Sequence, residues 1–339
     1  MGELALLLFE ALVYPGLLFT LAAALATQWY ARKLYARMQS RVGPLHTGPS
    51  GLLQPLADLI KLMAKEDVAV RGSSDRLVAG LLVIAIGSLT ALLLMTPLTH
   101  PVRALFNSFA VISADFDVAL AIYLLVWPTA SLALIGFMSP SPFSILGSSR
   151  LLSIAIAYEV SFALSLLTPV AMASLLRAPQ LSIYATSLAS WGLWANPITA
   201  APMAISLVTA LISLQCKLME KPFDIPEAET EIVAGPFTEY SGPKLALITL
   251  LHDVELFAGS ALIAFVFLGG PQPFTQAWWS GPLTLLIKYL AVVLVLTSIK
   301  AAVARLRVDQ ALLLFWRYVL PLSLASLVAA TALAPLALA

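Results

Sequence analysis

Long apolar runs alternate with short charged or Pro/Gly-rich segments along the whole chain. A bilayer core about 30 Å thick needs roughly 20 apolar residues per helix, so runs of this length indicate membrane-spanning helices. Eight such runs occur, at residues 4–30, 77–98, 116–138, 151–176, 198–219, 244–269, 282–301 and 311–336. The pattern predicts an all-α integral membrane protein with about eight transmembrane helices, in a single membrane domain over residues 1–339.

The distribution of Lys and Arg predicts the orientation, because basic loops stay on the cytoplasmic side. Fifteen of the nineteen basic residues lie in four alternate loops. These loops are residues 31–76, 139–150, 217–244 and 300–310. The opposite loops hold only Arg103 and Arg177. We therefore expect a multi-pass protein of the cell inner (cytoplasmic) membrane with both termini on the outer face.

The first cytoplasmic loop, residues 31–76, contains an amphipathic pattern. Residues 51–66 place apolar side chains on one broad helical face, with Asp58 and Lys61 elsewhere. This stretch is too short and too charged to span the membrane, so it predicts one amphipathic cytoplasmic helix after the first span. Such a helix lies at the level of the lipid headgroups or, alternatively, walls a cavity or docks a soluble partner.

The second charged loop, residues 217–244, is acidic. Its carboxylates alternate with Ile, Val, Ala and Phe, whereas a merely solvated loop would show more Lys, Ser and Asn. Helical spacing would put Glu227 and Glu231 on one face, where partly buried carboxylates repel and titrate as a coupled set. We interpret this segment as an acidic coupling loop. Its candidate residues are Asp224, Glu227, Glu229, Glu231 and Glu239.

A few ionisable residues lie inside the apolar runs. A charge in the bilayer is costly and by default marks an ion or proton path that faces the bundle interior. Glu159 lies about eight residues inside its run, and Asp253 and Glu255 lie inside the run 244–269. These three residues are candidates for an intramembrane path.

Composition excludes several classes of protein. Of the 339 residues 60% are hydrophobic and only 11% are charged, with a mean hydropathy of +0.93, so a soluble domain is excluded. The formal net charge of +1 offers no basic surplus for a nucleic-acid partner. One Cys and three His cannot assemble a metal or iron–sulfur site, and no nucleotide or nucleophile motif is present. We expect no catalytic centre and no cofactor bound by this chain itself.

Two motifs in the charged loops resemble a known family. The first is Arg37-Met-Gln-Ser-Arg41-Val-Gly-Pro44 followed by residues 51–61, and the second is Pro226-Glu-Ala-Glu-Thr-Glu-Ile-Val-Ala-Gly235 with Glu239-Tyr-Ser-Gly242. Together they resemble the ND1-type membrane subunit of respiratory complex I and of related energy-converting, membrane-bound nickel–iron hydrogenases. The resemblance covers most of the chain.

The resemblance implies a subunit that anchors a soluble redox arm and couples it to proton or sodium translocation. It implies that the loop acids and Glu159 belong to the ion path or coupling machinery, together with Asp253 and Glu255. It also implies a docking surface or chamber wall, formed by Arg37, Arg41, Gln54, Asp58 and Lys61. The implied partners are membrane lipid, soluble subunits on the cytoplasmic side, and antiporter-like membrane subunits.

The resemblance leaves two branches of the family open. The sequence of residues 221–226 and 234–237 resembles the hydrogenases more closely. In these enzymes the partner subunits hold a nickel–iron centre and iron–sulfur clusters. The alternative is a quinone-chamber subunit of a complex I-type quinone oxidoreductase, in which quinone is the electron acceptor. A rival of another class is a secondary transporter, which would move a solute without partner subunits.

Overall fold

The computed structural model describes residues 8–68, 72–99, 116–176, 181–274 and 280–334, and these residues form helices and loops with no strand among them. Eight segments are long and apolar enough to cross a membrane. Their bounds are Leu8–Met38, Asp75–Leu94, Asp117–Met138, Pro142–Leu175, Pro197–Lys217, Gly242–Val266, Ser280–Ala302 and Val308–Leu333. The prediction of an all-α integral membrane protein with eight spans is confirmed.

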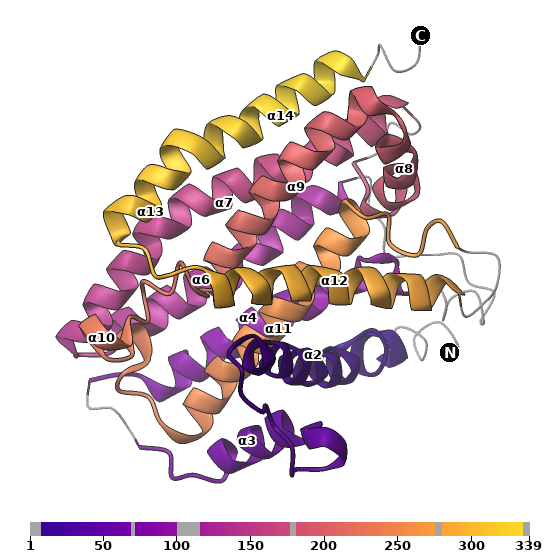
Figure 1. The fold of residues 1–339 in the computed structure, drawn as a ribbon. Coiled ribbons are helices and arrows are strands. Elements are labelled where there is room, and N and C mark those ends of the chain that lie inside the picture. Colours follow the sequence, from indigo (N-terminus) through magenta and orange to yellow (C-terminus); the bar gives the residue numbers. More distant parts are fainter. Residues whose placement is uncertain (1–7, 69–71, 100–115, 177–180, 275–279, 335–339) are drawn as a thin grey trace.

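The elements follow one another along the chain as numbered in Figure 1. The longer helices are α2 (Leu17–Met38), α4 (Asp75–Leu94), α6 (Asp117–Met138), α7 (Pro142–Leu176), α9 (Pro197–Lys217), α11 (Gly242–Val266), α12 (Ser280–Ala302) and α14 (Leu320–Leu333). The shorter elements are η1 (Pro49–Gly51), α3 (Gln54–Met63), η2 (Pro97–Thr99), α8 (Ile183–Ala195), α10 (Glu229–Ile232), η3 (Gly235–Phe237), α13 (Val308–Leu314) and the π-helical η4 (Phe315–Val319).

The helices pack in two groups, and α11, a member of the second, also contacts α7 and α9 of the first. Helices α7, α9 and α14 contact one another, and α2, α11 and α12 form a second group (Figure 1). Helix α6 packs between α4 and α7. Residues 257–267 of α11 and the turn after it are all buried, so this helix is surrounded by protein rather than by lipid. A helix enclosed in this way can hold polar side chains away from the hydrocarbon.

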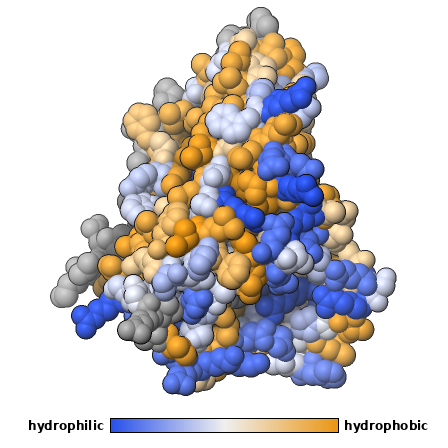
Figure 2. Space-filling model, turned by 90° about the vertical axis from the view of Figure 1, so that its left-hand side faces the viewer, coloured by the Kyte–Doolittle hydropathy of each residue, from blue (hydrophilic) through white to orange (hydrophobic). Residues whose placement is uncertain are grey.

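Helices α10 and α8 mark opposite ends of the bundle (Figure 1). Helix α14 ends at the end that carries α8, and α2 begins there, as expected for an even number of spans. Hydrophilic side chains gather over the lower and right-hand parts of the end that carries α10 (Figure 2). The chain termini (residues 1–7 and 335–339) and the two predicted outer-loop cations, Arg103 and Arg177, lie outside the described residues, so the side of the termini stays a prediction.

Two helices begin or end several residues away from the predicted runs, and one helix was not predicted. Helix α2 continues to Met38, because its last two turns carry basic side chains that can reach the headgroups although they end the apolar run. Helix α7 begins at Pro142 rather than near residue 151, since the fixed φ of proline suits the first position of a helix. Helix α8 was not predicted, because its thirteen residues are too few to span.

The amphipathic helix is present as α3. It leaves Leu56, Ile60 and Met63 exposed on one side and packs against α2 and α11 on the other. An ion pair of 2.5 Å between Arg32 Nη1 and Asp58 Oδ2 joins it to α2. The exposed apolar side chains fit a helix at the membrane surface or under a partner, as the sequence indicates.

Candidate functional site

A largely buried group of charged side chains lies where α7, α9 and α11 come together. Lys217 is the last residue of α9, and its side chain is fully buried. Its Nζ lies 2.6 Å from Glu159 Oε1 on α7 and 3.6 Å from Glu255 Oε1 on α11. We call Glu159, Lys217 and Glu255 the acid–lysine cluster. One cation is thus shared unequally between two carboxylates from different helices.

Polar neighbours on α6 and α7 complete the acid–lysine cluster. Lys217 Nζ also donates to Thr129 Oγ1 at 3.1 Å. The same Thr129 oxygen lies 2.9 Å from the Tyr158 hydroxyl and 3.4 Å from Glu159 Oε1. A buried ion pair is tolerated only when further hydrogen bonds satisfy its remaining donors and acceptors. Thr129 supplies such bonds to Lys217 and Glu159, whereas Glu255 Oε1 has no hydrogen-bond partner among the described residues. The C-terminal end of α9 favours a cation at Lys217.

A second polar group leads from the acid–lysine cluster toward the acidic loop. His252 lies one turn before Glu255 on α11, and its Nε2 is 3.3 Å from Glu227 Oε1 of the loop. Asp253, beside it, is 7% exposed. The side chain of Glu227 is about one-third exposed and therefore reaches solvent. Ionisable side chains consequently follow one another from the surface of the loop to the interior of the bundle.

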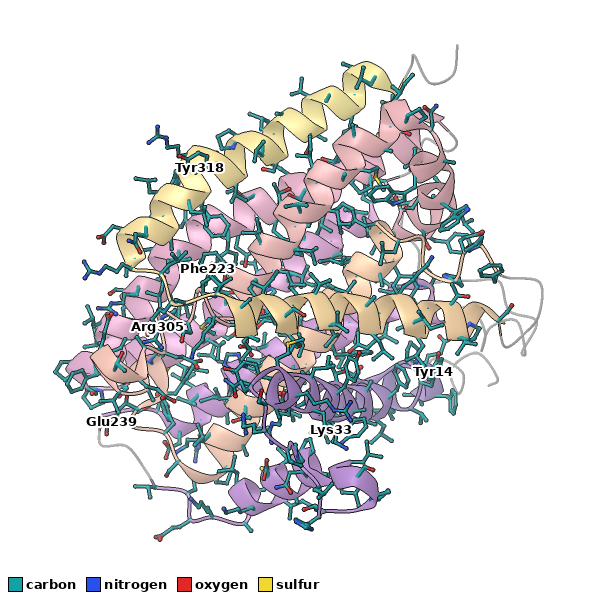
Figure 3. All side chains as sticks on the ribbon, in the orientation of Figure 1. Tyr14, Lys33, Phe223, Glu239, Arg305 and Tyr318 are labelled. Atoms are coloured by element: carbon teal, nitrogen blue, oxygen red, sulfur yellow. The ribbon has the colours of Figure 1, made fainter. Side chains whose placement is uncertain are left out.

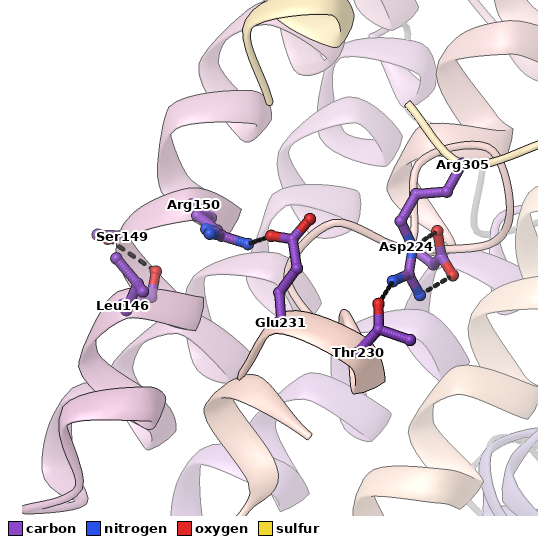
Figure 4. Close-up of polar contacts among 7 residues, drawn as sticks. All are labelled: Leu146, Ser149, Arg150, Asp224, Thr230, Glu231 and Arg305. Carbon is purple, nitrogen blue, oxygen red and sulfur yellow. Dashed lines mark hydrogen bonds and ion pairs between the residues drawn. The ribbon is translucent and has the colours of Figure 1, made fainter. Parts of the chain in front are cut away.

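Two arginines hold the acidic loop to α7 and to the segment between α12 and α13 (Figure 4). Arg305 binds both oxygens of Asp224, at 2.7 and 2.5 Å, and donates to Thr230 Oγ1 at 3.1 Å. The hydrogen bonds that Arg305 donates to the Asp224 carboxylate raise the pKa of Arg305 above its ordinary value. Arg150 of α7 binds Glu231 Oε2 at 2.6 Å. Both bonds lie at the end of the bundle opposite Tyr14, where Figure 3 also shows Glu239.

The residues that follow the acidic loop fix it to the bundle from the other side. The hydroxyl of Tyr240 donates to the Ile135 carbonyl oxygen at 2.8 Å, and burial raises the pKa of this phenol. Lys244, at the start of α11, lies 2.7 Å from Asp75 Oδ1 and 3.0 Å from Asp67 Oδ1. These bonds fix the position at which α11 enters the bundle, and with it the placement of His252.

The arrangement of the loop glutamates corrects two expectations. Helix α10 covers only residues 229–232, so Glu227 and Glu231 do not share a helical face and bind different bases. Glu229, Glu231 and Glu239 are exposed in this chain and do not join the buried acids. Among the loop carboxylates that the structure describes, Glu227 is the one that contacts a residue of the interior path, His252. The coupled, mutually repelling set of loop carboxylates expected from helical spacing is therefore wrong.

A separate cavity of about 420 Å³ lies between α2 and the turn that precedes α3. Its lining residues are Arg32, Tyr35, Arg41, Val42, Gly43, Pro44 and Gln54. Of the predicted docking set, Arg41 and Gln54 line the cavity. Asp58 is not part of the lining, but its Oδ1 accepts a hydrogen bond of 2.9 Å from Gln54 Nε2. Arg37 and Lys61 are exposed outside the lining.

Sequence reasoning missed the central residue, Lys217. Lys217 follows Cys216 at the end of an apolar run, so the sequence pattern assigns it to the cytoplasmic loop as an ordinary surface cation. The available signal was the spacing of Thr209, Ser213 and Lys217, which puts three polar residues on one face of α9. The roles of Thr129 and Arg305 had no comparable signal, because each depends on a contact with a distant segment.

We expect Arg305→Ala to loosen the acidic loop without unfolding the bundle. The two hydrogen bonds to Asp224 are partly exposed, and charge pairs of this kind contribute about 1 kcal/mol. An opening free energy lowered by about 1 kcal/mol raises the population of the open loop roughly fivefold. The rate of proteolysis within residues 224–239, measured on the full chain in detergent, should rise accordingly. Arg307→Ala, which removes a neighbouring arginine that does not bind Asp224, is the control and should leave this rate unchanged.

Comparison with known proteins gives a consistent result. A family model described as NADH dehydrogenase matches residues 11–331. The H-type subunit of the NADH-quinone oxidoreductase of Thermomicrobium roseum is 36% identical over 311 residues, 87% of each chain. A corresponding H-type subunit of Geobacter sulfurreducens is also 36% identical, over 95% of this chain and 92% of its own. That of Koribacter versatilis is 32% identical over 96% of this chain and 97% of its own.

Proposed function

Because this chain belongs to the NADH dehydrogenase family as a complex I-type membrane subunit, we propose that it anchors a soluble redox arm and couples electron transfer there to ion movement through the membrane. The chain would do so without a redox centre of its own. Iron–sulfur clusters and any nickel–iron centre would belong to partner subunits on the cytoplasmic side. Antiporter-like membrane subunits would share the ion translocation.

The observation that carries this proposal is the continuous run of ionisable side chains from the acidic loop to the acid–lysine cluster. Glu227 contacts His252 at the surface end, and Lys217 lies between the partly buried carboxylate of Glu159 and the buried carboxylate of Glu255 at the inner end. Intramembrane charges that face protein rather than lipid are typical of ion and proton paths. A purely structural anchor would not need two carboxylates for one buried lysine.

The unequal sharing of Lys217 suggests how coupling would work. Its ammonium is 2.6 Å from one carboxylate and 3.6 Å from the other, so a small movement would exchange the nearer partner. A change of charge beside Glu227 would alter the potential at Glu255 and favour one of the two positions. Coupling of this kind requires two sites that bias one two-state element, and Lys217 is that element in the proposal.

The cavity beside α2 is the proposed site where a redox partner or its substrate meets this chain. Its volume lies in the range of small-molecule sites. Arg41, Gln54 and Tyr35 offer hydrogen-bond donors beside apolar surface, a lining that fits a quinone headgroup with its two carbonyl acceptors. The exposed Arg37 and Lys61 would contact the soluble arm.

The sequence of the loop motifs indicates the hydrogenase branch, whereas the names of the relatives favour the quinone-reducing branch. Purification of the intact complex decides between them. Reduction of an added quinone with no nickel in the complex is expected for the first branch, and bound nickel with hydrogen production for the second. Solute uptake by this chain alone in vesicles would support the secondary transporter and contradict the proposal.

The proposal predicts that Glu159→Gln uncouples ion pumping from electron flow or stalls both. The substitution keeps the shape of the side chain but removes the charge nearest to Lys217. Glu231→Gln should have a smaller effect, because its carboxylate is half exposed and binds only Arg150. Both are measured as ion translocation and electron transfer in vesicles that contain the complex. Glu229→Gln, at an exposed position of the same loop, is the matched control. Coupled pumping at the control level in Glu159→Gln would refute the assignment.

A further inference from the structure

A line of buried hydroxyl side chains runs outward from the acid–lysine cluster between α7, α9 and α14. We call these eight residues the hydroxyl seam, and each of them is at most 2% exposed. They are Ser161, Ser165, Thr168, Ser206, Thr209, Ser213, Ser323 and Ser326. The three helices contact one another along their length, so the seam lies in protein and not against lipid.

The register of two helices joins the hydroxyl seam to the acid–lysine cluster. On α9, Thr209, Ser213 and Lys217 follow at intervals of four residues and share one face. On α7, Tyr158 and Ser161 share a face in the same way. Tyr158 is bonded to Thr129, which accepts from Lys217. The seam therefore begins where the charged residues end.

Two hydrogen bonds cross between helices within the hydroxyl seam. Ser165 Oγ lies 2.8 Å from Thr209 Oγ1, and Thr168 Oγ1 lies 3.2 Å from Ser326 Oγ. Ser165 Oγ is also 2.7 Å from the Ser161 carbonyl oxygen, and Thr209 Oγ1 is 3.1 Å from that of Ile205. A hydroxyl has one proton, so the hydroxyls of Ser165 and Thr209 can each donate to either of two acceptors. Rotation of the hydroxyls can thus reverse the direction of the bonds.

Two further features indicate that the hydroxyl seam holds water. Ser213 Oγ is fully buried and has no hydrogen-bond partner, although it lies one turn from Lys217 and one turn from Thr209. Pro169, inside α7, has no amide hydrogen, so the Ser165 carbonyl loses its helical donor. Buried polar atoms are almost always bonded to protein or to ordered water, and water often satisfies the carbonyl that a proline leaves free in a membrane helix.

We propose that the hydroxyl seam is a hydrated proton path that leads outward from the acid–lysine cluster through this chain. The inference rests on the proposed function, because the acid–lysine cluster is the source of the protons. Each seam oxygen accepts a proton on one side while it gives its own proton to the next oxygen or water, and only O–H bonds form and break. The structure follows this path to the Thr168–Ser326 pair.

Hydration of the hydroxyl seam can be measured with a thiol probe. Ser213→Cys in the intact complex should react with methyl methanethiosulfonate at least about tenfold faster than the native Cys216, which is buried among apolar side chains one turn away. Mass spectrometry of the chain distinguishes the two adducts. Ser190→Cys, at a buried position on α8 whose hydroxyl donates to protein carbonyl oxygens, should stay as unreactive as Cys216.

Proton transfer along the hydroxyl seam requires a second measurement. The double variant Ser165→Ala/Thr209→Val removes one cross-helix bond and nearly preserves shape. We expect it to lower the ratio of protons translocated to electrons transferred, while the complex assembles and transfers electrons normally. Thr186→Val is the matched control, since this threonine is buried on α8 and its hydroxyl donates within its own helix. The control should keep the full ratio.

Both results are needed, and failure of either overturns the inference. An unreactive Ser213→Cys, or a full proton ratio in the double variant, would mean that these small side chains serve only the close packing of helices. If Glu159→Gln uncouples pumping while the seam variants do not, the proposed function stands and only this inference fails. If Glu159→Gln has no effect either, the proposed function fails as well.

Discussion

Lys217→Met should destabilise this chain more than any other single removal of a charge. The variant keeps much of the side-chain volume but leaves the buried Glu255 and the partly buried Glu159 without the cation that they share. Removal of one partner from a buried ion pair costs about 3–5 kcal/mol, because the remaining charge has lost its compensation. We expect a strongly reduced amount of folded chain in membranes and a lower thermal unfolding midpoint of the purified protein in detergent.

A compensating variant separates stability from coupling. Lys217→Met/Glu159→Gln removes the cation together with its nearer carboxylate, so most of the lost stability should return while coupled ion pumping stays absent. Lys300→Met is the control, because Lys300 binds Glu220 at 2.5 Å with both side chains about one-third exposed. Loss of that pair should cost at most about 1 kcal/mol. Equal unfolding midpoints for Lys217→Met and Lys300→Met would show that the acid–lysine cluster does not behave as a buried ion pair.

The spans and the buried acids could be predicted from sequence because each leaves a local signal. A run of about 20 apolar residues is uncommon outside membrane spans, and a carboxylate such as Glu159 or Glu255 interrupts such a run visibly. Lys217 gave no such signal, since a lysine after an apolar run usually marks the membrane surface. Its burial depends on α7 and α11, which come from segments far away in the chain.

In the acidic loop, helical periodicity does not predict which glutamates lie together. A helix through residues 227–231 would place its glutamates on one face, but the chain turns instead at two residues with positive φ. Val233 has a φ of +61° and ends α10 after one turn, and Gly235 has a φ of +51°. Sequence pattern does not reveal that a β-branched residue adopts a positive φ, because the buried neighbours Ile232 and Gly235 impose this conformation on Val233, whose own side chain is exposed.

Gly235→Ala should displace the acidic loop and abolish coupled pumping. A Cβ at this position would lie 1.8 Å from the Pro226 carbonyl oxygen, which belongs to the backbone and cannot rotate away. The positive φ adds a cost of about 1–2 kcal/mol for a residue other than glycine. The neighbouring Pro236 packs closely against Gly147 of α7, so a shift at residue 235 would also move the loop off that helix.

Gly72→Ala separates the steric clash of the added Cβ from the conformational cost of a positive φ. Gly72 also has a positive φ, of +91°, but a Cβ there would meet no atom within 4 Å. This variant should therefore show only the conformational cost, with normal pumping. Gly235→Ala should in addition lose the contact between Glu227 and His252, which is measured as faster proteolysis of residues 224–239 and as electron transfer without ion translocation. If the two variants behaved alike, the position of the loop would not control the acid–lysine cluster, and electron transfer would have to act on Lys217 by another route.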